Sequence, residues 1–234
     1  ALHQRVVDQG LARCLPAGLL EGVLRGAQDI AGTPEMRTLT VLSGRLSDFD
    51  NALRSLPPRC SARLLGQYLD MANEVAVAHG GTLTHFSADR IDILFGAPEP
   101  MEPEHSLPVA LRCALALQEA TGALSEPWQE AGLLPPQLCV GVHRGEALVG
   151  MIGGASRAEY TAIGPAVHLA EKLAGVATPG AVMLSCELSD ELPIGLTQSA
   201  GTVLLQGASE PMRLVRLCED AAEHLTSDAL RRSA

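Results

Sequence analysis

The sequence predicts a mixed α/β sandwich, in which helices flank a largely antiparallel sheet. Two observations support this class. Segments rich in β-branched residues alternate with segments whose apolar residues recur at helical spacing. Several strand-like segments also follow one another through tight turns, and hairpins pair their strands antiparallel. A doubly wound parallel sheet would instead need a long crossover between neighbouring strands.

The first half of the chain is predicted to begin with a helical, leucine-rich lead-in over residues 1–32. A strand is expected over Arg37–Leu42, because TLTVL is rich in β-branched residues, and a short helix over Asp48–Ser55. A long helix is predicted over Ser61–His79, where the apolar residues keep to one face and two glycines follow. The segment THFSADRIDILFG, residues 84–96, then reads as a hairpin.

The second half is predicted to continue with a helix over Ser106–Leu124. A second hairpin is expected over residues 137–154, with QLCVGVHRG and EALVGMIGG as its two strands. A further helix is expected over Gly164–Ala174. The last unit pairs AVMLS with TVLLQGASEPMRLVRL, within residues 181–217, as strand, turn and strand.

The composition excludes several classes of protein. The chain has 234 residues, and a hydrophobic content of 47% excludes general disorder. A net charge of -10 argues against nucleic-acid binding, which needs a basic surface. No apolar run approaches the roughly 20 residues of a membrane span. The six cysteines are dispersed without a CxxC spacing, as is typical of reduced thiols in a cytosolic protein.

A carboxylate stands at the tip of the predicted hairpin over residues 84–96. Asp89 lies in the turn Ala88-Asp89-Arg90, and Asp92 follows inside the second strand. Aspartate is a common turn residue, which is one explanation. The other explanation is that a rigid hairpin tip holds a metal ligand, and a divalent cation there needs a second carboxylate nearby.

Five segments together resemble the class III adenylate/guanylate cyclase catalytic domain. They are TVLSGRLSDF, LLGQYLDMANEVAVAHGGTLTHFSADRIDILFGAPEP, LCVGVHRGEALVGMIGG, EYTAIGPAVHLAEKL and GASEPMRLVRL. Their order and spacing match the family from about Thr38 to Leu217, which is most of the chain. The earlier segment RCLPAGLLEGVLRG is similar to the helical linker that joins such domains to an upstream sensor.

This resemblance implies a ferredoxin-like cyclase core that works as a head-to-tail dimer, with two active sites at the interface. In the family, two aspartates of one protomer hold two divalent metals, Mg²⁺ or Mn²⁺, on the triphosphate of ATP or GTP. An Asn and an Arg of the other protomer orient the ribose and stabilise charge on the phosphates. The ribose 3′-hydroxyl then attacks the α-phosphate, which gives a cyclic nucleotide and pyrophosphate.

The resemblance places an arginine at the position of the first metal aspartate. The family pattern F-A-D-I-x-G-F aligns with Ser43–Phe49, so Arg45 stands in place of the aspartate, and a guanidinium cannot ligate Mg²⁺. Asp89 matches the second metal aspartate. We therefore expect an ion pair between Asp89 and Arg45 instead of a metal site. Asp48 or Asp50 could substitute as a ligand, but both lie several residues beyond the strand end.

Four further positions correspond to functional residues of the family. His85 stands at the base-selecting lysine, and Thr161 at the second base-selecting position, where threonine resembles a common bacterial subgroup. His168 aligns with the ribose-orienting Asn, and Lys172 aligns with the transition-state Arg. The i, i+4 spacing keeps these last two on one helix face. Lysine retains the positive charge but not the bidentate fork of arginine.

These substitutions predict a degenerate cyclase domain of a signalling protein, without independent cyclase activity. It would serve as a dimerising regulatory module or as a nucleotide-sensing one, with Lys172, His168 and Arg45 facing metal-free phosphates. The alternative is an active adenylate or guanylate cyclase, through unusual ligands or in a heterodimer with an intact partner domain. The family implies Mg²⁺ or Mn²⁺ as a cofactor, and Arg45 argues against it here.

We expect the chain to be a piece of a longer protein. Residues 1–35 would form the lead-in from a missing upstream region, residues 36–219 the cyclase homology domain, and residues 220–234 a C-terminal tail. The expected partners are a second cyclase domain, in a homodimer or heterodimer, and an upstream sensor domain. We expect a cytoplasmic location without nucleic acid or membrane contact by this segment, in a soluble or membrane-anchored parent protein.

Overall fold

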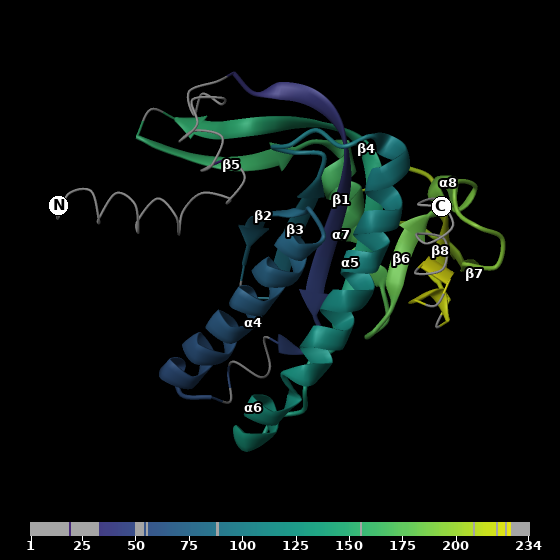
Figure 1. Ribbon diagram of the computed structural model, residues 1–234. Helices are drawn as coiled ribbons and strands as arrows, with labels where there is room; N and C mark the ends of the chain where they lie inside the picture. The colour runs from purple at the N-terminus through teal and green to yellow at the C-terminus, as the bar shows by residue number, and fades with distance from the viewer. Residues whose placement is uncertain are drawn as a thin grey trace.

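The computed structural model describes residues 19, 33–49, 54, 56–87, 89–154, 156–207, 209–218, 220–222 and 224–225. Within these residues the chain forms one mixed sheet with helices on both of its faces (Figure 1). The predicted fold class, an α/β sandwich around a mostly antiparallel sheet, is confirmed. Most of the predicted lead-in, tail and short helix over residues 48–55 lies outside the described residues.

The strands that line up in the sheet are β1 Glu35–Leu46, β2 Thr82–Phe86, β3 Arg90–Phe95, β4 Leu138–Gly154, β5 Arg157–Ile163, β6 Val182–Ser185, β7 Thr197–Val203 and β8 Met212–Leu217. The helices are α4 Pro58–Ala78, α5 Pro103–Ala123, α6 Ser125–Glu130, α7 Pro165–Val176 and α8 Cys186–Ser189. The three long predicted helices are confirmed as α4, α5 and α7, each with slightly earlier starts or later ends.

The sheet is built around β1 and β4, which run antiparallel along the whole length of β1. Its strand order is β2-β3-β1-β4-β6-β8-β7, and β5 pairs with the second half of β4. All of these pairs are antiparallel except that between β4 and β6. The long hairpin of β4 and β5 extends away from the rest of the sheet, beside the start of β1 (Figure 1).

Side chains alternate between the two faces of β1, and each face packs against a different set of helices. Leu42 and Leu46 belong to a buried cluster with α4 and α5. Leu39 and Val41 belong to a second cluster, which includes the buried alanines of α7. Because successive residues of a strand point to opposite faces, Ser43 and Arg45 lie on the α7 side. This alternation decides which side chains can form a site with α7.

The second predicted hairpin, over residues 137–154, is wrong. The two segments QLCVGVHRG and EALVGMIGG form one continuous strand, β4, instead of two strands and a turn. Gly145 read as the turn, but it pairs with Leu39 in an unbroken ladder between β1 and β4. The long partner strand therefore holds this glycine extended. The hairpin partner of β4 is β5, which we did not predict, as we did not predict α6 and α8.

Helix α7 lies directly on the backbone of β4 at Gly141. A Cβ atom added at Gly141 would meet the carbonyl oxygen of Ala170 at 2.2 Å and the backbone nitrogen of Ala174 at 2.4 Å. Neither backbone atom can move without displacing the helix. Gly141 is thus required by close packing, and it fixes how near α7 lies to the sheet.

We predict that Gly141→Ala lowers the free energy of unfolding by about 1–3 kcal/mol, because the added methyl group overpacks this contact. Gly122→Ala is the matched control. It introduces the same methyl group in α5, where an added Cβ meets nothing within 4 Å. It should be neutral or slightly stabilising, since alanine is the better helix former. Urea unfolding monitored by circular dichroism measures both changes, and equal stabilities of the two variants would contradict this account of the packing.

Candidate functional site

The site lies at the end of β1, where Arg45 is the last residue but one of the strand. Arg45 is half-buried and faces the α7 side of the sheet. In the register of the sheet it stands opposite Arg90 of β3 and Cys139 of β4. Its Nε atom is buried and has no hydrogen-bond partner among the described residues. Strand β1 therefore places the positively charged guanidinium of Arg45 at this position.

The tip of the β2–β3 hairpin is fastened to the end of β1 by backbone hydrogen bonds. The amide of Leu46 on β1 donates to the carbonyl oxygen of Asp89 at 2.8 Å, and within the hairpin the amide of Ser87 donates to the carbonyl oxygen of Arg90 at 2.8 Å. These bonds hold Asp89 beside Arg45 without using its carboxylate. On the other side of the hairpin, the hydroxyl of Tyr68 is buried, and burial followed by the charge of Asp89 raises its pKa.

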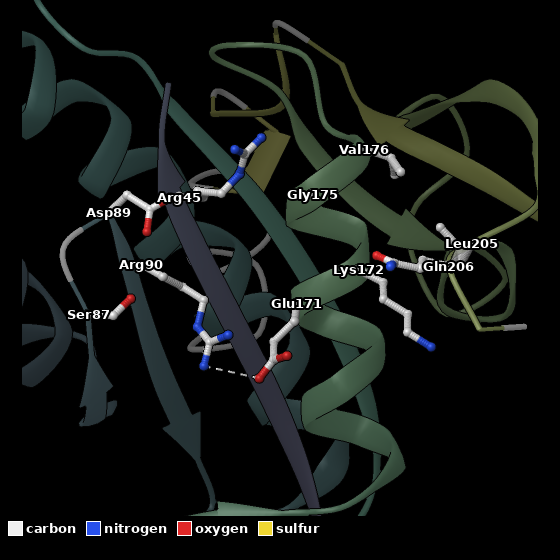
Figure 2. A pocket seen from close by; sticks show the side chains of 10 residues that line it. All are labelled: Arg45, Ser87, Asp89, Arg90, Glu171, Lys172, Gly175, Val176, Leu205 and Gln206. Atoms are coloured by element: carbon white, nitrogen blue, oxygen red, sulfur yellow. Dashed lines mark ion pairs between the residues drawn. The ribbon is translucent and has the colours of Figure 1, made fainter. Parts of the chain in front are cut away.

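Arg45 and Asp89 line one cavity of about 540 Å³. The hairpin tip and β1 form one wall, and the last two turns of α7, with Lys172 and Gly175, form another. The segment between β7 and β8 contributes Leu205 (Figure 2). Elements that are far apart in the sequence thus converge on this cavity.

The predicted ion pair between Arg45 and Asp89 is wrong. Both side chains line the cavity, but they form no ion pair, and neither makes a side-chain hydrogen bond to another described residue. Figure 2 shows the Arg45 guanidinium directed away from the Asp89 carboxylate. Strand β1 sets the direction of the Arg45 side chain, and the backbone of the hairpin sets the position of Asp89. The two residues therefore occupy the positions of the family's two metal aspartates without touching each other.

A different arginine forms the ion pairs of this site. One terminal nitrogen of Arg90, Nη2, lies 3.2 Å from Asp92 Oδ2 in the same strand and 3.2 Å from Glu171 Oε1 on α7. The second of these contacts is the dashed line in Figure 2. Arg90 therefore links β3 to α7 across the end of β1, and its charge is shared between two carboxylates.

Asp92 is the buried member of this group, with a side-chain exposure of 4%. It accepts a hydrogen bond of 2.7 Å from the hydroxyl of Ser43 on β1. Burial raises the pKa of Asp92, and the Ser43 hydrogen bond and the charge of Arg90 oppose that rise. Desolvation has a larger effect on this pKa than the Ser43 hydrogen bond and the charge of Arg90. Burial of the ionised carboxylate therefore costs free energy, and the ion pair with Arg90 offsets part of that cost.

Sequence reasoning missed this group of Ser43, Arg90, Asp92 and Glu171. One signal was available, because a carboxylate inside the apolar run IDILF needs a cation if it is buried. Strand periodicity also indicates Arg90 as that cation, because residues two apart in a strand lie on the same face. The contribution of Glu171 does not follow from this periodicity, since it depends on how α7 lies on the sheet.

The structure separates the two predicted residues of α7. Lys172 lines the cavity. His168, one turn earlier, is 68% exposed, does not line the cavity, and lies 3.9 Å from Glu171 through its Nδ1 atom. Within a single chain, therefore, Lys172 and not His168 belongs to the cavity that contains Asp89.

The two predicted base-selecting positions lie away from the cavity but on neighbouring elements. His85 is on β2, where it pairs with Asp92 of β3. Thr161 is on β5, where it pairs with Gly150 of β4. Strand β5 contacts β2, so the fold brings the two strands that carry these positions together.

The residues present at this site do not fit a Mg²⁺ or Mn²⁺ ion. Hard divalent cations need several oxygen ligands, and Asp89 is the one carboxylate of the cavity that no arginine engages. Glu171 is paired with Arg90, and Arg45 adds a positive charge. Within the described residues, no three His, Cys, Asp or Glu side chains gather as metal ligands. Asp48 is exposed in the turn after β1 and does not line the cavity, and Asp50 lies outside the described residues.

Comparison with known proteins shows the family of this chain. The family description of the adenylate and guanylate cyclase catalytic domain matches residues 93–215, more than half of the sequence. The chain therefore belongs to the adenylate and guanylate cyclase catalytic domain family.

Individual relatives agree with this assignment. Adenylate cyclase 1 of Rhizobium meliloti is 30% identical over 189 residues, which are 76% of this chain and 28% of the relative. The adenylate cyclase of Anabaena cylindrica is 25% identical over 157 residues, 65% of this chain and 30% of the relative. The chain thus spans less than a third of the length of either relative.

Solved structures show the same fold. The adenylyl cyclase CyaB from P. aeruginosa superposes with a TM-score of 0.75 and 24% identity, covering 80% of this chain and 96% of that one. The guanylyl cyclase Cya2 reaches a TM-score of 0.72 and 26% identity, covering 80% of this chain and 94% of that one. Among the described residues, no helix has the length and apolar character that crossing a membrane requires.

We predict that Asp92 gives stability an unusual dependence on pH. A carboxyl group whose pKa is raised by folding binds more protons in the folded state, so its contribution to stability is greatest at low pH and declines as pH rises through the raised pKa. The pH range over which stability falls therefore begins near the ordinary pKa of an aspartate, about 4, and extends upward to the raised pKa of Asp92. The stability difference between the wild type and Asp92→Asn, measured by urea unfolding from pH 4 to 7, should shift against the wild type as pH rises. A difference that is constant across this range would contradict the prediction.

We also predict that Arg45→Asp creates a weak divalent-cation site. The substitution removes the cation and places a second carboxylate in the cavity beside Asp89. Electron paramagnetic resonance should show Mn²⁺ binding with a dissociation constant of about 10⁻⁴–10⁻³ M, as in weak carboxylate sites. The wild type should leave the free Mn²⁺ signal unchanged. The double variant Arg45→Asp/Asp89→Asn is the control, and Mn²⁺ binding as strong as in Arg45→Asp would refute a paired site.

Proposed function

We propose that this chain is a degenerate member of the cyclase family that acts as a dimerising regulatory module and has no cyclase activity of its own. The observation that carries the proposal is Arg45, a cation at the position where the family has a metal aspartate, in the same cavity as Asp89. Two-metal chemistry depends on carboxylates that neutralise and position both ions. The positive charge of a guanidinium in that position repels both ions.

The other departures from the family act in the same direction. Lys172 keeps a positive charge without the bidentate geometry of arginine, and His168 replaces an amide with a single donor and acceptor. Glu171, beside them, adds a carboxylate that is bound to Arg90. Removal of one electrostatic group from an active site costs about 10²–10³ in kcat in other enzymes. Several such losses together leave too little stabilisation of the transition state for an independent enzyme.

A role as a dimerising module is supported by what the substitutions leave intact. Buried apolar clusters cover both faces of the sheet in the described residues, and the long β4–β5 hairpin extends beyond them (Figure 1). Ile163 at the end of β5 and Met36 at the start of β1 are exposed apolar side chains near this hairpin. Such residues suit association with a second cyclase domain, in a homodimer or a heterodimer.

One observation favours the alternative, an active cyclase. Asp89 is retained, and relatives that are 30% and 25% identical are named adenylate cyclases. A partner domain with an intact first metal aspartate and an intact Asn and Arg would have to supply what this chain lacks. The present chain would then contribute Asp89 to a shared site.

We predict that the purified chain, incubated with Mn²⁺ and either ATP or GTP, yields no cyclic nucleotide above a protein-free blank. Mass-spectrometric detection of cyclic AMP and cyclic GMP is the measurement, and light scattering on the same sample reports the oligomeric state. Asp89→Ala is the control for contaminating cyclase. Turnover in the wild type that disappears in Asp89→Ala would overturn the proposal, whereas turnover that persists would come from a contaminant.

A further inference from the structure

We propose that the cavity between β1, the β2–β3 hairpin tip and α7 binds a small hydroxylated phosphate ester directly on Arg45, without a divalent cation. The shared chemistry is one phosphate group and at least one nearby hydroxyl, as found in nucleotides and in sugar phosphates. This inference rests on the proposed function, because an ion held for catalysis would exclude it. It names the ligand that the degenerate site takes in place of the metal-bound substrate.

We infer the phosphate group of the ligand from the guanidinium of Arg45, which is unpaired among the described residues. Its guanidinium forms no ion pair or hydrogen bond with another described residue, and its Nε atom is buried. A half-buried guanidinium offers up to five donors and no acceptor, so it is satisfied by an oxyanion. Phosphate matches its planar fork through two parallel hydrogen bonds.

The other cations of the cavity differ in their availability. Arg90 is occupied, because Asp92 and Glu171 share its Nη2 atom. Lys172 has no ion pair to a described residue, and its amino group lies near Gly207, at the side of the cavity formed by the segment before β8. Its flexible stem can bring a second positive charge to an anion held by Arg45. The free cations are therefore Arg45 and Lys172, on opposite walls.

We infer the hydroxyl group of the ligand from the carboxylate of Asp89. This carboxylate lies in the same cavity, half-buried, and forms no ion pair or side-chain hydrogen bond with another described residue. An ionised carboxylate only accepts hydrogen bonds. It repels a bare anion but accepts from a hydroxyl of the ligand. Arg45 and Asp89, held apart as Figure 2 shows, thus select a ligand with an acceptor at one end and a donor at the other.

The size and walls of the cavity fit a small molecule. Its volume of about 540 Å³ falls within the range of about 300–1,000 Å³ typical of such sites. Val176 and the buried Leu205 add apolar surface on the α7 side, against which the remainder of a ligand can pack. A free inorganic phosphate would use neither Asp89 nor this apolar surface.

The experiment is calorimetric titration of the chain in EDTA with three probes: ATP, ribose 5-phosphate and inorganic phosphate. We expect ATP or ribose 5-phosphate, or both, to bind at least tenfold more tightly than inorganic phosphate. Binding by both in equal measure would identify the sugar phosphate as the recognised part, and binding by ATP alone would identify a nucleotide. Addition of Mg²⁺ should not raise the affinity, because the cation competes with Arg45 for the phosphate.

Three variants test the residues. Arg45→Gln should weaken binding by about tenfold or more, the effect of losing a charged hydrogen bond. Asp89→Ala, on the separately fastened hairpin tip, removes the acceptor and should abolish the preference over inorganic phosphate even if Arg45→Gln fails to fold. Arg213→Gln, an exposed arginine of β8 outside the cavity, is matched in charge loss and should bind as the wild type does.

Two results would overturn the inference: absence of heat with all three probes at millimolar concentration, or affinity that rises when Mg²⁺ replaces EDTA. Equal loss of binding in Arg45→Gln and Arg213→Gln would also refute it, by reducing the effect to net charge. Failure here remains distinct from failure of the proposed function. A chain that binds no probe and forms no cyclic nucleotide loses only this inference, whereas cyclic nucleotide formation overturns the proposed function itself.

Discussion

The site depends on how closely α7 lies against β4. At Gly141 the helix backbone is so near the strand that no side chain fits between them. That approach brings Glu171 on α7 within 3.2 Å of Arg90 on β3, across the end of β1. It also brings Lys172 into the cavity that contains Arg45 and Asp89. A helix held farther from the sheet would separate Glu171 from Arg90 and Lys172 from the cavity.

The charged side chains near α7 form two sets. In one set each charge has a partner within the fold, and in the other, Arg45 and Asp89, neither charge has one among the described residues. Arg90 is bound by Asp92 and Glu171, and Ser43 donates to Asp92, so this group needs nothing from outside. Loss of Arg90 would leave a buried carboxylate without its cation, a change that costs about 3–5 kcal/mol in comparable cases. Arg45 and Asp89 face the same cavity without contact. The first group satisfies its own charges within the fold, and the second pair is the part of the site that the proposed ligand would use.

The sequence was sufficient to predict the fold class, the long helices and the hairpin that presents Asp89, because these depend on local periodicity and turn residues. It failed at β4, where a glycine read as a turn is kept extended by pairing with β1. The cavity was predictable only in part. Alignment with the family identified Arg45, Asp89 and Lys172, but not their contacts. The pairing of Arg90 with Glu171 depends on the placement of a helix that lies about 80 residues away in sequence.

The hairpin tip shows why retention of an aspartate does not imply retention of a metal. The carbonyl oxygen of Asp89 holds the tip to β1 by accepting from Leu46, and the amide of Ser87 closes the hairpin on the carbonyl oxygen of Arg90, so both bonds use backbone groups. Any residue at position 89 would preserve these bonds, so the fold makes no use of the carboxylate. The positive charge of Arg45 in the same cavity opposes a cation there, and it leaves the carboxylate free to accept a hydrogen bond. The role open to Asp89 is therefore recognition of a donor on a ligand, alongside an arginine that recognises an acceptor.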